Sequence, residues 1–167
     1  EAAERDHIPG GAGRATDRVT GGVLDCHPRA RVPAIQHAGG IRPDEVYKGK
    51  TDYIAIVSNE KKVRVVSPDM KEVSKLSARG LIVTAKGDSV DFVSRFFAPQ
   101  SGIDEDPVTG SAHTSLIPIW SAKLGKMEMT ARQLSKRGGD LLAVNKGGRC
   151  FIGGKARLYM VGEISIA

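Results

Sequence analysis

The sequence is poor in aromatic residues and cysteine, and it has no long apolar run. Phe, Trp and Tyr make up 5% of its 167 residues, so a core must be built mainly from aliphatic side chains. Cys26 and Cys150 are too far apart for a metal-binding or redox motif, which indicates a reducing compartment. No run approaches the length of a membrane span, and no signal-peptide core is present. We therefore expect a cytoplasmic protein that does not enter a membrane.

Charge is mixed along the chain rather than gathered in blocks. Lys and Arg number 25 and Asp and Glu 19, for a formal net charge of +6. This excess favours anionic small-molecule partners. It does not indicate nucleic-acid binding, because no aromatic platform accompanies the basic residues. With 40% hydrophobic and 26% charged residues, the composition is that of one soluble globular domain.

Residues 1–40 differ from the rest of the chain. They contain no Phe, Tyr or Trp and show no hydrophobic period of a helix or a strand. His7, His27 and His37 fall here, but their spacing is not that of metal ligands. We interpret residues 1–40 as an atypical leader, either disordered or of aberrant origin such as out-of-frame translation, and residues 41–167 as the folded domain.

Beyond residue 40 the pattern alternates between strands and helices. We expect strands over residues 52–57, 62–66, 81–85, 90–97, 127–133, 141–144, 149–152 and 156–164. A short helix is predicted to begin at residues 43–46, a second follows the N-cap Asp69, and a third covers residues 111–124. Gly153 and Gly154 are predicted to form a turn or bulge. Because the third helix is apolar on most sides, we predict an α+β fold with a mostly antiparallel or mixed sheet curled around it.

The stretch from Gly102 to His113 has the features of a binding site. Acidic residues end at Asp106, and Thr109, Gly110 and Ser111 then begin the third helix. The first backbone N–H groups of a helix lack internal partners, and they favour an anion such as a carboxylate. We therefore predict that this stretch lies at the mouth of the curled sheet and receives a small acid.

The acids of this stretch allow more than one interpretation. Asp106 either contacts a substrate, as a proton shuttle or an orienting acceptor, or caps the helix or pairs with a basic side chain. Asp104 and Glu105 are interpreted as loop charges or as local partners of Arg137 or Lys136.

Two further kinds of site are disfavoured. Ser111 and His113 are two residues apart on a helix and point to different faces, which argues against a nucleophile and its base. Consecutive acids rarely converge on one ion without further ligands, so no metal site is predicted.

Several of these motifs resemble the second lobe of the PhzF-like proteins of phenazine biosynthesis. The specific part is Arg95–Pro99 with Gly102 and Glu105–His113. Further matches are Trp120, Leu124–Lys126, Gln133, Ser135, Arg137–Gly139 and a closing strand over Gly154–Glu163. The resemblance covers about residues 41–166. It implies one lobe of a fold similar to that of diaminopimelate epimerase, in which each lobe is a curled sheet around a central helix and the active site lies between the lobes.

The resemblance also implies an activity, which is isomerisation by proton transfer on a small carboxylate-bearing metabolite without a cofactor. Asp106 matches a catalytic position in the substrate pocket. Ser111 and Gly110 match substrate-binding positions, and Thr109 matches a motif position that we include among them. The family further suggests a homodimer.

One part of the family pattern has no match in this sequence. The general acid/base glutamate and a pocket histidine belong to the first lobe, and nothing in residues 1–40 resembles that lobe. We therefore expect an incomplete site in a truncated chain. The alternative is a non-catalytic lobe that binds small anions weakly or not at all. Either way, an uncovered apolar face near the central helix is expected to promote self-association.

Overall fold

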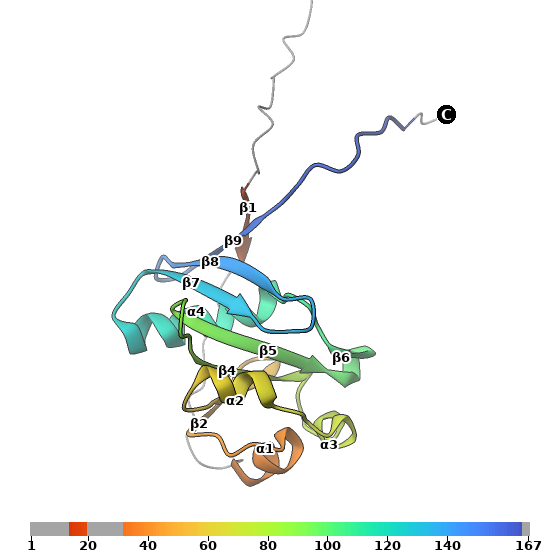
Figure 1. Cartoon of the computed structure of the whole chain (residues 1–167), viewed down its shortest axis with the longest axis vertical. Coiled ribbons are helices and arrows are strands. Elements are labelled where there is room, and N and C mark those ends of the chain that lie inside the picture. Colours follow the sequence, from red (N-terminus) through yellow and green to blue (C-terminus); the bar gives the residue numbers. More distant parts are fainter. Residues whose placement is uncertain (1–13, 20–31, 165–167) are drawn as a thin grey trace, which may run out of the picture.

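The computed structural model describes residues 14–19 and 32–164, and it consists of a mixed sheet with helices on both faces (Figure 1). The strands are β1 (Arg14–Val19), β2 (Glu45–Lys48), β3 (Asp52–Ile56), β4 (Gly80–Lys86), β5 (Phe92–Ala98), β6 (Ile103–Glu105), β7 (Glu128–Gln133), β8 (Gly139–Asn145) and β9 (Cys150–Lys155). The helices are α1 (Val32–Gly39), α2 (Glu60–Val65), α3 (Met70–Ser74), the short 3-10 helix η1 (Pro99–Ser101) and α4 (Gly110–Leu124).

The sheet follows the order β1-β9-β8-β7-β5-β4-β3-β2, and β6 pairs with β5 outside this path. Two neighbouring pairs, β3 with β4 and β5 with β7, are parallel, and the other pairs are antiparallel. The predicted α+β class and mixed sheet are therefore confirmed.

Helix α4 is the central helix that the sequence predicts. Its buried side chains form one hydrophobic cluster with residues from six consecutive strands of the sheet, including Ile54, Ile82, Phe92, Met129, Leu141 and Ile152. A single helix touches so many strands only if the sheet curls around it. The helix runs without a break through Pro118, and Gly125, in the left-handed conformation, ends it.

The opposite face of the sheet carries α1, α2 and α3 over a second hydrophobic cluster. Ile35 and Ala38 of α1 are buried in this cluster. Residues 32–40 are therefore packed as part of the folded domain, which begins earlier than the predicted boundary at residue 40. The rest of the predicted leader lies outside the described residues, apart from the backbone of β1, which pairs with β9.

Two short segments between residues 43 and 66 adopt the opposite structure to the one predicted. Residues 45–48 form a strand rather than a helix, because they pair with β3 and the Asp44 N–H donates to Ile56 O at 2.8 Å. Residues 60–65 form α2 rather than a strand. The Asn59 side chain caps this helix by accepting from the Lys62 N–H, and Arg64 pairs with Glu60 one turn away.

The predicted final strand over residues 156–164 is wrong. Strand β9 continues through Gly153 and Gly154, where a turn or bulge was predicted, and ends at Lys155. The chain then leaves the sheet without forming a strand (Figure 1). It exposes the large apolar side chains Leu158, Tyr159, Met160, Val161 and Ile164. No helix in the described part of the chain could span a membrane.

The loop that precedes α4 is held against the turn between β7 and β8. The Ser135 hydroxyl donates to Pro107 O at 2.7 Å and accepts from the Gly138 N–H at 3.0 Å. Gly138 has φ +68°, and a Cβ on Gly139 would lie 2.5 Å from Val108 Cγ2. The two glycines therefore allow a left-handed turn and a close approach to Val108 that a side chain would prevent.

The start of α4 is also fixed from inside the core by His113. This side chain is fully buried beside Phe92, and its Nδ1 lies 2.7 Å from Thr109 O. Because a carbonyl oxygen only accepts, Nδ1 carries the proton and Nε2 is unprotonated. Nε2 has no hydrogen-bond partner among the described residues. Burial lowers the pKa of His113, so the imidazole is neutral in the folded protein.

We predict that Gly139→Ala displaces the loop before α4 and destabilises the fold. The added methyl group would overlap Val108, so we expect a loss of about 1–3 kcal/mol in the free energy of unfolding. Urea denaturation measures this loss. Gly148→Ala is the matched control, since a Cβ there meets no heavy atom within 4 Å. Equal losses in the two variants would contradict the close contact.

We predict that His113 makes stability fall as the pH drops below its ordinary pKa. The unfolded chain takes up a proton near pH 6.5 that the folded protein resists, so the free energy of unfolding decreases by at most about 1.4 kcal/mol per pH unit. The carboxylates with lowered pKa contribute only at more acidic pH. Urea denaturation between pH 7 and 5 should show the effect in the native chain and less of it in His113→Gln. Identical slopes would mean that the imidazole is not held neutral.

Candidate active site

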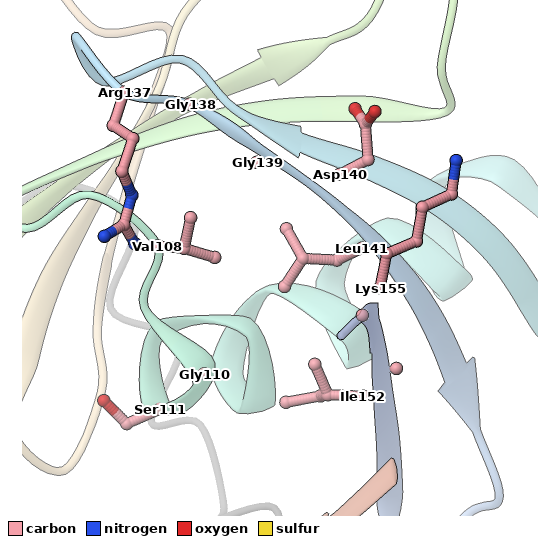
Figure 2. Close-up of a pocket in the computed structure, with 12 residues that line it drawn as sticks. Val108, Gly110, Ser111, Arg137, Gly138, Gly139, Asp140, Leu141, Ile152 and Lys155 are labelled. Carbon is pink, nitrogen blue, oxygen red and sulfur yellow. The ribbon is translucent and has the colours of Figure 1, made fainter. Parts of the chain in front are cut away.

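A pocket of about 700 Å³ opens where α4 begins (Figure 2). Its wall combines the loop before α4, the first residues of that helix, the turn between β7 and β8, and the facing parts of β8 and β9. The wall residues are Val108, Gly110, Ser111, Arg137, Gly138, Gly139, Asp140, Leu141, Ile152, Gly153, Gly154 and Lys155. Val108, Leu141 and Ile152 give the wall an apolar middle part, and polar groups lie around it.

The first turn of α4 presents unpaired donors to this pocket. Thr109 is the N-cap residue, but its side chain makes no capping hydrogen bond. No acceptor for the N–H groups of Gly110 and Ser111 is found among the described residues, and both residues line the pocket. Free N–H groups at the positive end of a helix dipole form a site for an anion.

Two cationic side chains line the same pocket. Arg137 extends from the β7–β8 turn toward Val108, and Lys155 lies at the other end of the wall beside Asp140 (Figure 2). Asp140 is the one carboxylate of the wall, and Arg132 Nε donates to its Oδ1 at 2.5 Å. This hydrogen bond lowers the pKa of Asp140. The two cations and the helix start together outweigh the single carboxylate.

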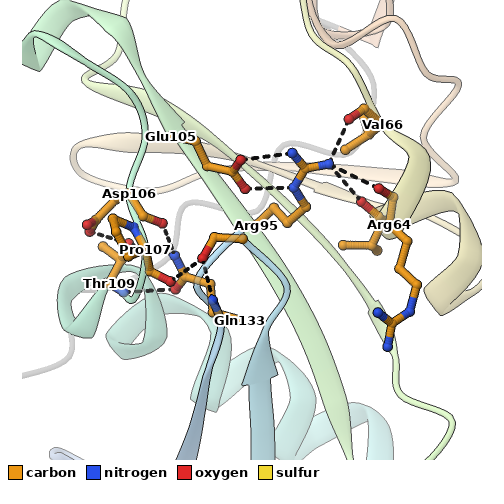
Figure 3. Close-up of polar contacts among 11 residues, drawn as sticks. Arg64, Val66, Arg95, Glu105, Asp106, Pro107, Thr109 and Gln133 are labelled. Carbon is orange, nitrogen blue, oxygen red and sulfur yellow. Dashed lines mark hydrogen bonds and ion pairs between the residues drawn. The ribbon is translucent and has the colours of Figure 1, made fainter.

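Asp106 lies next to the pocket rather than in its wall. Its side chain is half-buried, and Oδ2 accepts from the Thr109 hydroxyl at 2.5 Å (Figure 3). Oδ1 has no hydrogen-bond partner in the described part of the chain. The backbone of Asp106 is fixed on both sides, because its N–H donates to Phe96 O and its carbonyl accepts from Gln133 Nε2 at 2.7 Å.

Thr109 has no polar group left for a ligand. It is buried, its N–H donates to Gln133 Oε1 at 2.8 Å, and its hydroxyl accepts from Gln133 Nε2 at 3.0 Å while donating to Asp106. Its carbonyl accepts from His113. Of the four residues predicted for the site, Gly110 and Ser111 line the pocket, Asp106 borders it, and Thr109 supports the loop from inside.

The acidic neighbours of Asp106 have different partners from those considered in the sequence. Glu105 forms a two-point ion pair with Arg95, with distances of 2.7 and 2.9 Å, rather than pairing with Arg137 or Lys136 (Figure 3). Arg95 also donates to Val66 O at 2.7 Å, which ties β5 to the end of α2. Asp104 is exposed and forms no ion pair within the described ranges.

Ser111 and His113 do not form a nucleophile and base pair. Ser111 lines the pocket, whereas His113 is enclosed in the core and bonded to Thr109. Nor do residues 14–19 and 32–164 contain a group of three or more His, Cys, Asp or Glu side chains that could hold a metal ion.

Sequence reasoning missed a pair of charged residues beside Ser111. Arg79 donates to both carboxylate oxygens of Asp52, and its Nη2 also donates to Ser111 Oγ at 3.1 Å. Asp52 begins β3 and Arg79 directly precedes β4. Because parallel neighbouring strands begin at the same edge of a sheet, this placement could have indicated the pair, but only if β3 and β4 had been recognised as parallel.

Comparison with known proteins identifies the family. A family model described as phenazine biosynthesis-like protein matches residues 28–162. Two uncharacterized isomerases of Pseudomonas aeruginosa are 45% and 44% identical over 133 and 139 residues, which is 80% and 83% of this chain and 51% and 53% of theirs. The chain thus spans about half the length of these curated relatives.

A solved structure gives the same result. The crystal structure of a PhzF family protein from Enterococcus faecalis superimposes with a TM-score of 0.82 at 38% sequence identity. The match covers 92% of this chain and 58% of that one. The resemblance drawn from the acid-Pro-Val-Thr-Gly-Ser-Ala-His motif and the diaminopimelate epimerase-like fold expected from it are therefore confirmed. The chain is a member of the phenazine biosynthesis-like family, whose members in Pseudomonas aeruginosa include proteins named as isomerases.

Proposed function

We propose that this chain carries the carboxylate-binding part of an isomerase that moves a proton on a small carboxylate-bearing metabolite without a cofactor. The observation that supports this proposal most is the uncapped start of α4, where Gly110 and Ser111 face a pocket that also holds Arg137 and Lys155. A carboxylate accepts hydrogen bonds and is negative, so it complements both the free donors and the charge of this wall.

In this proposal each predicted residue has a distinct role. The N–H groups of Gly110 and Ser111, with the Ser111 hydroxyl, hold the carboxylate of the substrate. Thr109 acts indirectly, because its hydroxyl donates to Oδ2 of Asp106. This hydrogen bond fixes the carboxylate and thereby orients its other oxygen, Oδ1. Asp106 then supplies Oδ1 to orient the substrate or to carry a proton, as a carboxylate held near a reacting carbon does.

Isomerisation by proton transfer needs a group that removes a proton and a group that returns one. Within the described pocket wall the single carboxylate, Asp140, is already paired with Arg132. The relatives are about twice as long as the region they share with this chain. We infer that the general acid/base glutamate lies in the part of the relatives outside the region shared with this chain, as the family pattern implies. The shared region then supplies the binding part.

A second candidate function is anion binding without catalysis. It is favoured by the composition of the described pocket wall, whose single carboxylate, Asp140, is already paired with Arg132. The two candidates make the same prediction for binding and different predictions for proton exchange.

We predict that the chain binds benzoate at the start of α4. In a titration followed by amide NMR, the Gly110 and Ser111 signals should shift with benzoate and not with benzamide, which has the same ring but no charge. Ser111→Ala should weaken binding by about tenfold, because it removes a hydrogen bond to a charged group worth about 1.5–3 kcal/mol at most sites. Ser115→Ala, one turn further along α4, is the matched control. Equal shifts with both compounds would exclude a carboxylate site.

We predict that the full-length Pseudomonas aeruginosa relative exchanges a carbon-bound proton of a carboxylate substrate with solvent. Vinylacetate in D₂O is the probe, because shifting its double bond requires proton removal and return. Where the residue aligned with Asp106 is an aspartate, its replacement by asparagine should slow deuterium uptake by about 10²–10⁴-fold. The exposed residue aligned with Asp88, on the turn after β4, provides the control substitution.

The same measurement on the present chain tests where the acid/base group lies, whereas exchange by the full-length relative is what separates the two candidates. We expect no deuterium uptake above that of buffer if the acid/base group lies in the further length of the relatives. Uptake by the chain alone would contradict that inference. An unchanged rate in the asparagine variant of the relative would contradict the role of Asp106.

A further inference from the structure

Arg79 is held in one place by contacts of its backbone, its guanidinium and its planar face. Its N–H donates to Thr51 O at 2.7 Å, and its guanidinium donates to Asp52 Oδ1 at 2.9 Å and Oδ2 at 2.5 Å. Its guanidinium carbon lies 5.1 Å from the centre of the Phe96 ring. Asp52 is itself almost fully buried and accepts from the Thr51 hydroxyl, so the carboxylate that holds Arg79 is fixed as well.

From this fixed position Arg79 forms a hydrogen bond with one residue of the proposed site, and it also interacts electrostatically with Asp106. Its Nη2 donates to Ser111 Oγ at 3.1 Å. A hydroxyl has two acceptor lone pairs and one proton to donate. The contact occupies one lone pair, and no described residue accepts the hydroxyl proton of Ser111. That proton therefore remains available to the pocket, which Ser111 lines.

We propose that Arg79 is a positioning residue that fixes the Ser111 hydroxyl as a donor toward the carboxylate of the bound metabolite. This inference rests on the proposed function and adds a residue to it. A serine on the surface of a helix otherwise exchanges between side-chain rotamers, and ordering it on binding reduces affinity. A hydroxyl that accepts from a guanidinium is also polarised, which strengthens the hydrogen bond that it donates.

Arg79 acts through Ser111 and not as a ligand of its own. It is absent from the pocket wall, and both oxygens of Asp52 already bind its guanidinium. Its positive charge is therefore largely offset by Asp52 before an anion enters. Lys cannot replace it, because one ammonium group lacks the planar fork that reaches Asp52 and Ser111 together.

The first test needs no ligand. Side-chain coupling constants of Ser111 are measured by NMR in the intact chain, in Arg79→Lys and in the control Arg64→Lys, which changes an ion pair on α2 instead. Arg79→Lys keeps a cation beside the buried Asp52, so it is the variant chosen to preserve the fold. We expect one dominant rotamer in the native chain and in the control, and rotamer averaging in Arg79→Lys. Averaging in the native chain, or no change in Arg79→Lys, would overturn the proposal.

The second test measures how Arg79 and Ser111 depend on each other in binding. Arg79→Lys should weaken benzoate binding about fivefold in the native background and leave it unchanged when Ser111 is already alanine. An equal loss in both backgrounds would mean that Arg79 acts by its charge or by direct contact, which overturns the proposal. If benzoate does not bind the native chain at all, the proposed function fails, and the rotamer measurement still decides whether Arg79 orders Ser111.

Discussion

The buried amide of Gln133 is the interaction on which the site depends. Gln133 is fully buried at the end of β7, where it donates to Asp106 O and the Thr109 hydroxyl and accepts from the Thr109 N–H. Both ends of the amide are satisfied, which makes its burial favourable, and an apolar side chain there would leave the Asp106 carbonyl and the Thr109 N–H unpaired. Because the Gln133 amide oxygen accepts the hydrogen bond of the Thr109 N–H, the first free donor at the start of α4 is the N–H of Gly110.

The curled sheet makes this arrangement rigid. Helix α4 is enclosed by the strands from β3 to β9, so its start has a fixed position relative to the turn before β8. His113 inside the core and the Ser135–Gly138 contact outside it hold the loop from opposite sides. A rigid frame of this kind positions hydrogen-bond donors before a ligand arrives, so that less freedom is lost on binding.

The elements with a clear local pattern could be predicted from the sequence, and those decided by distant partners could not. The apolar run of α4 and the N-cap Asp69 carry their own evidence, and both are present in the structure. Residues 45–48 have the composition of a helix start, but pairing with β3 makes them a strand. Residues 156–164 have the composition of a strand, but no described strand lies beside them. In the site, the motif indicated Gly110 and Ser111, whereas the contact of Arg79 with Ser111 depends on a parallel pairing that composition does not reveal.

The distribution of charge explains how acids and an anion site coexist in one loop. Three acids near the start of α4 that could repel a carboxylate have a basic or donor partner: Glu105 has Arg95, Asp52 has Arg79, and Asp106 has the Thr109 hydroxyl. The cations Arg137 and Lys155 and the free N–H groups remain in the wall itself. Because charges across low-dielectric protein interact more strongly than charges through water, this separation favours an anion despite the acidic sequence around it.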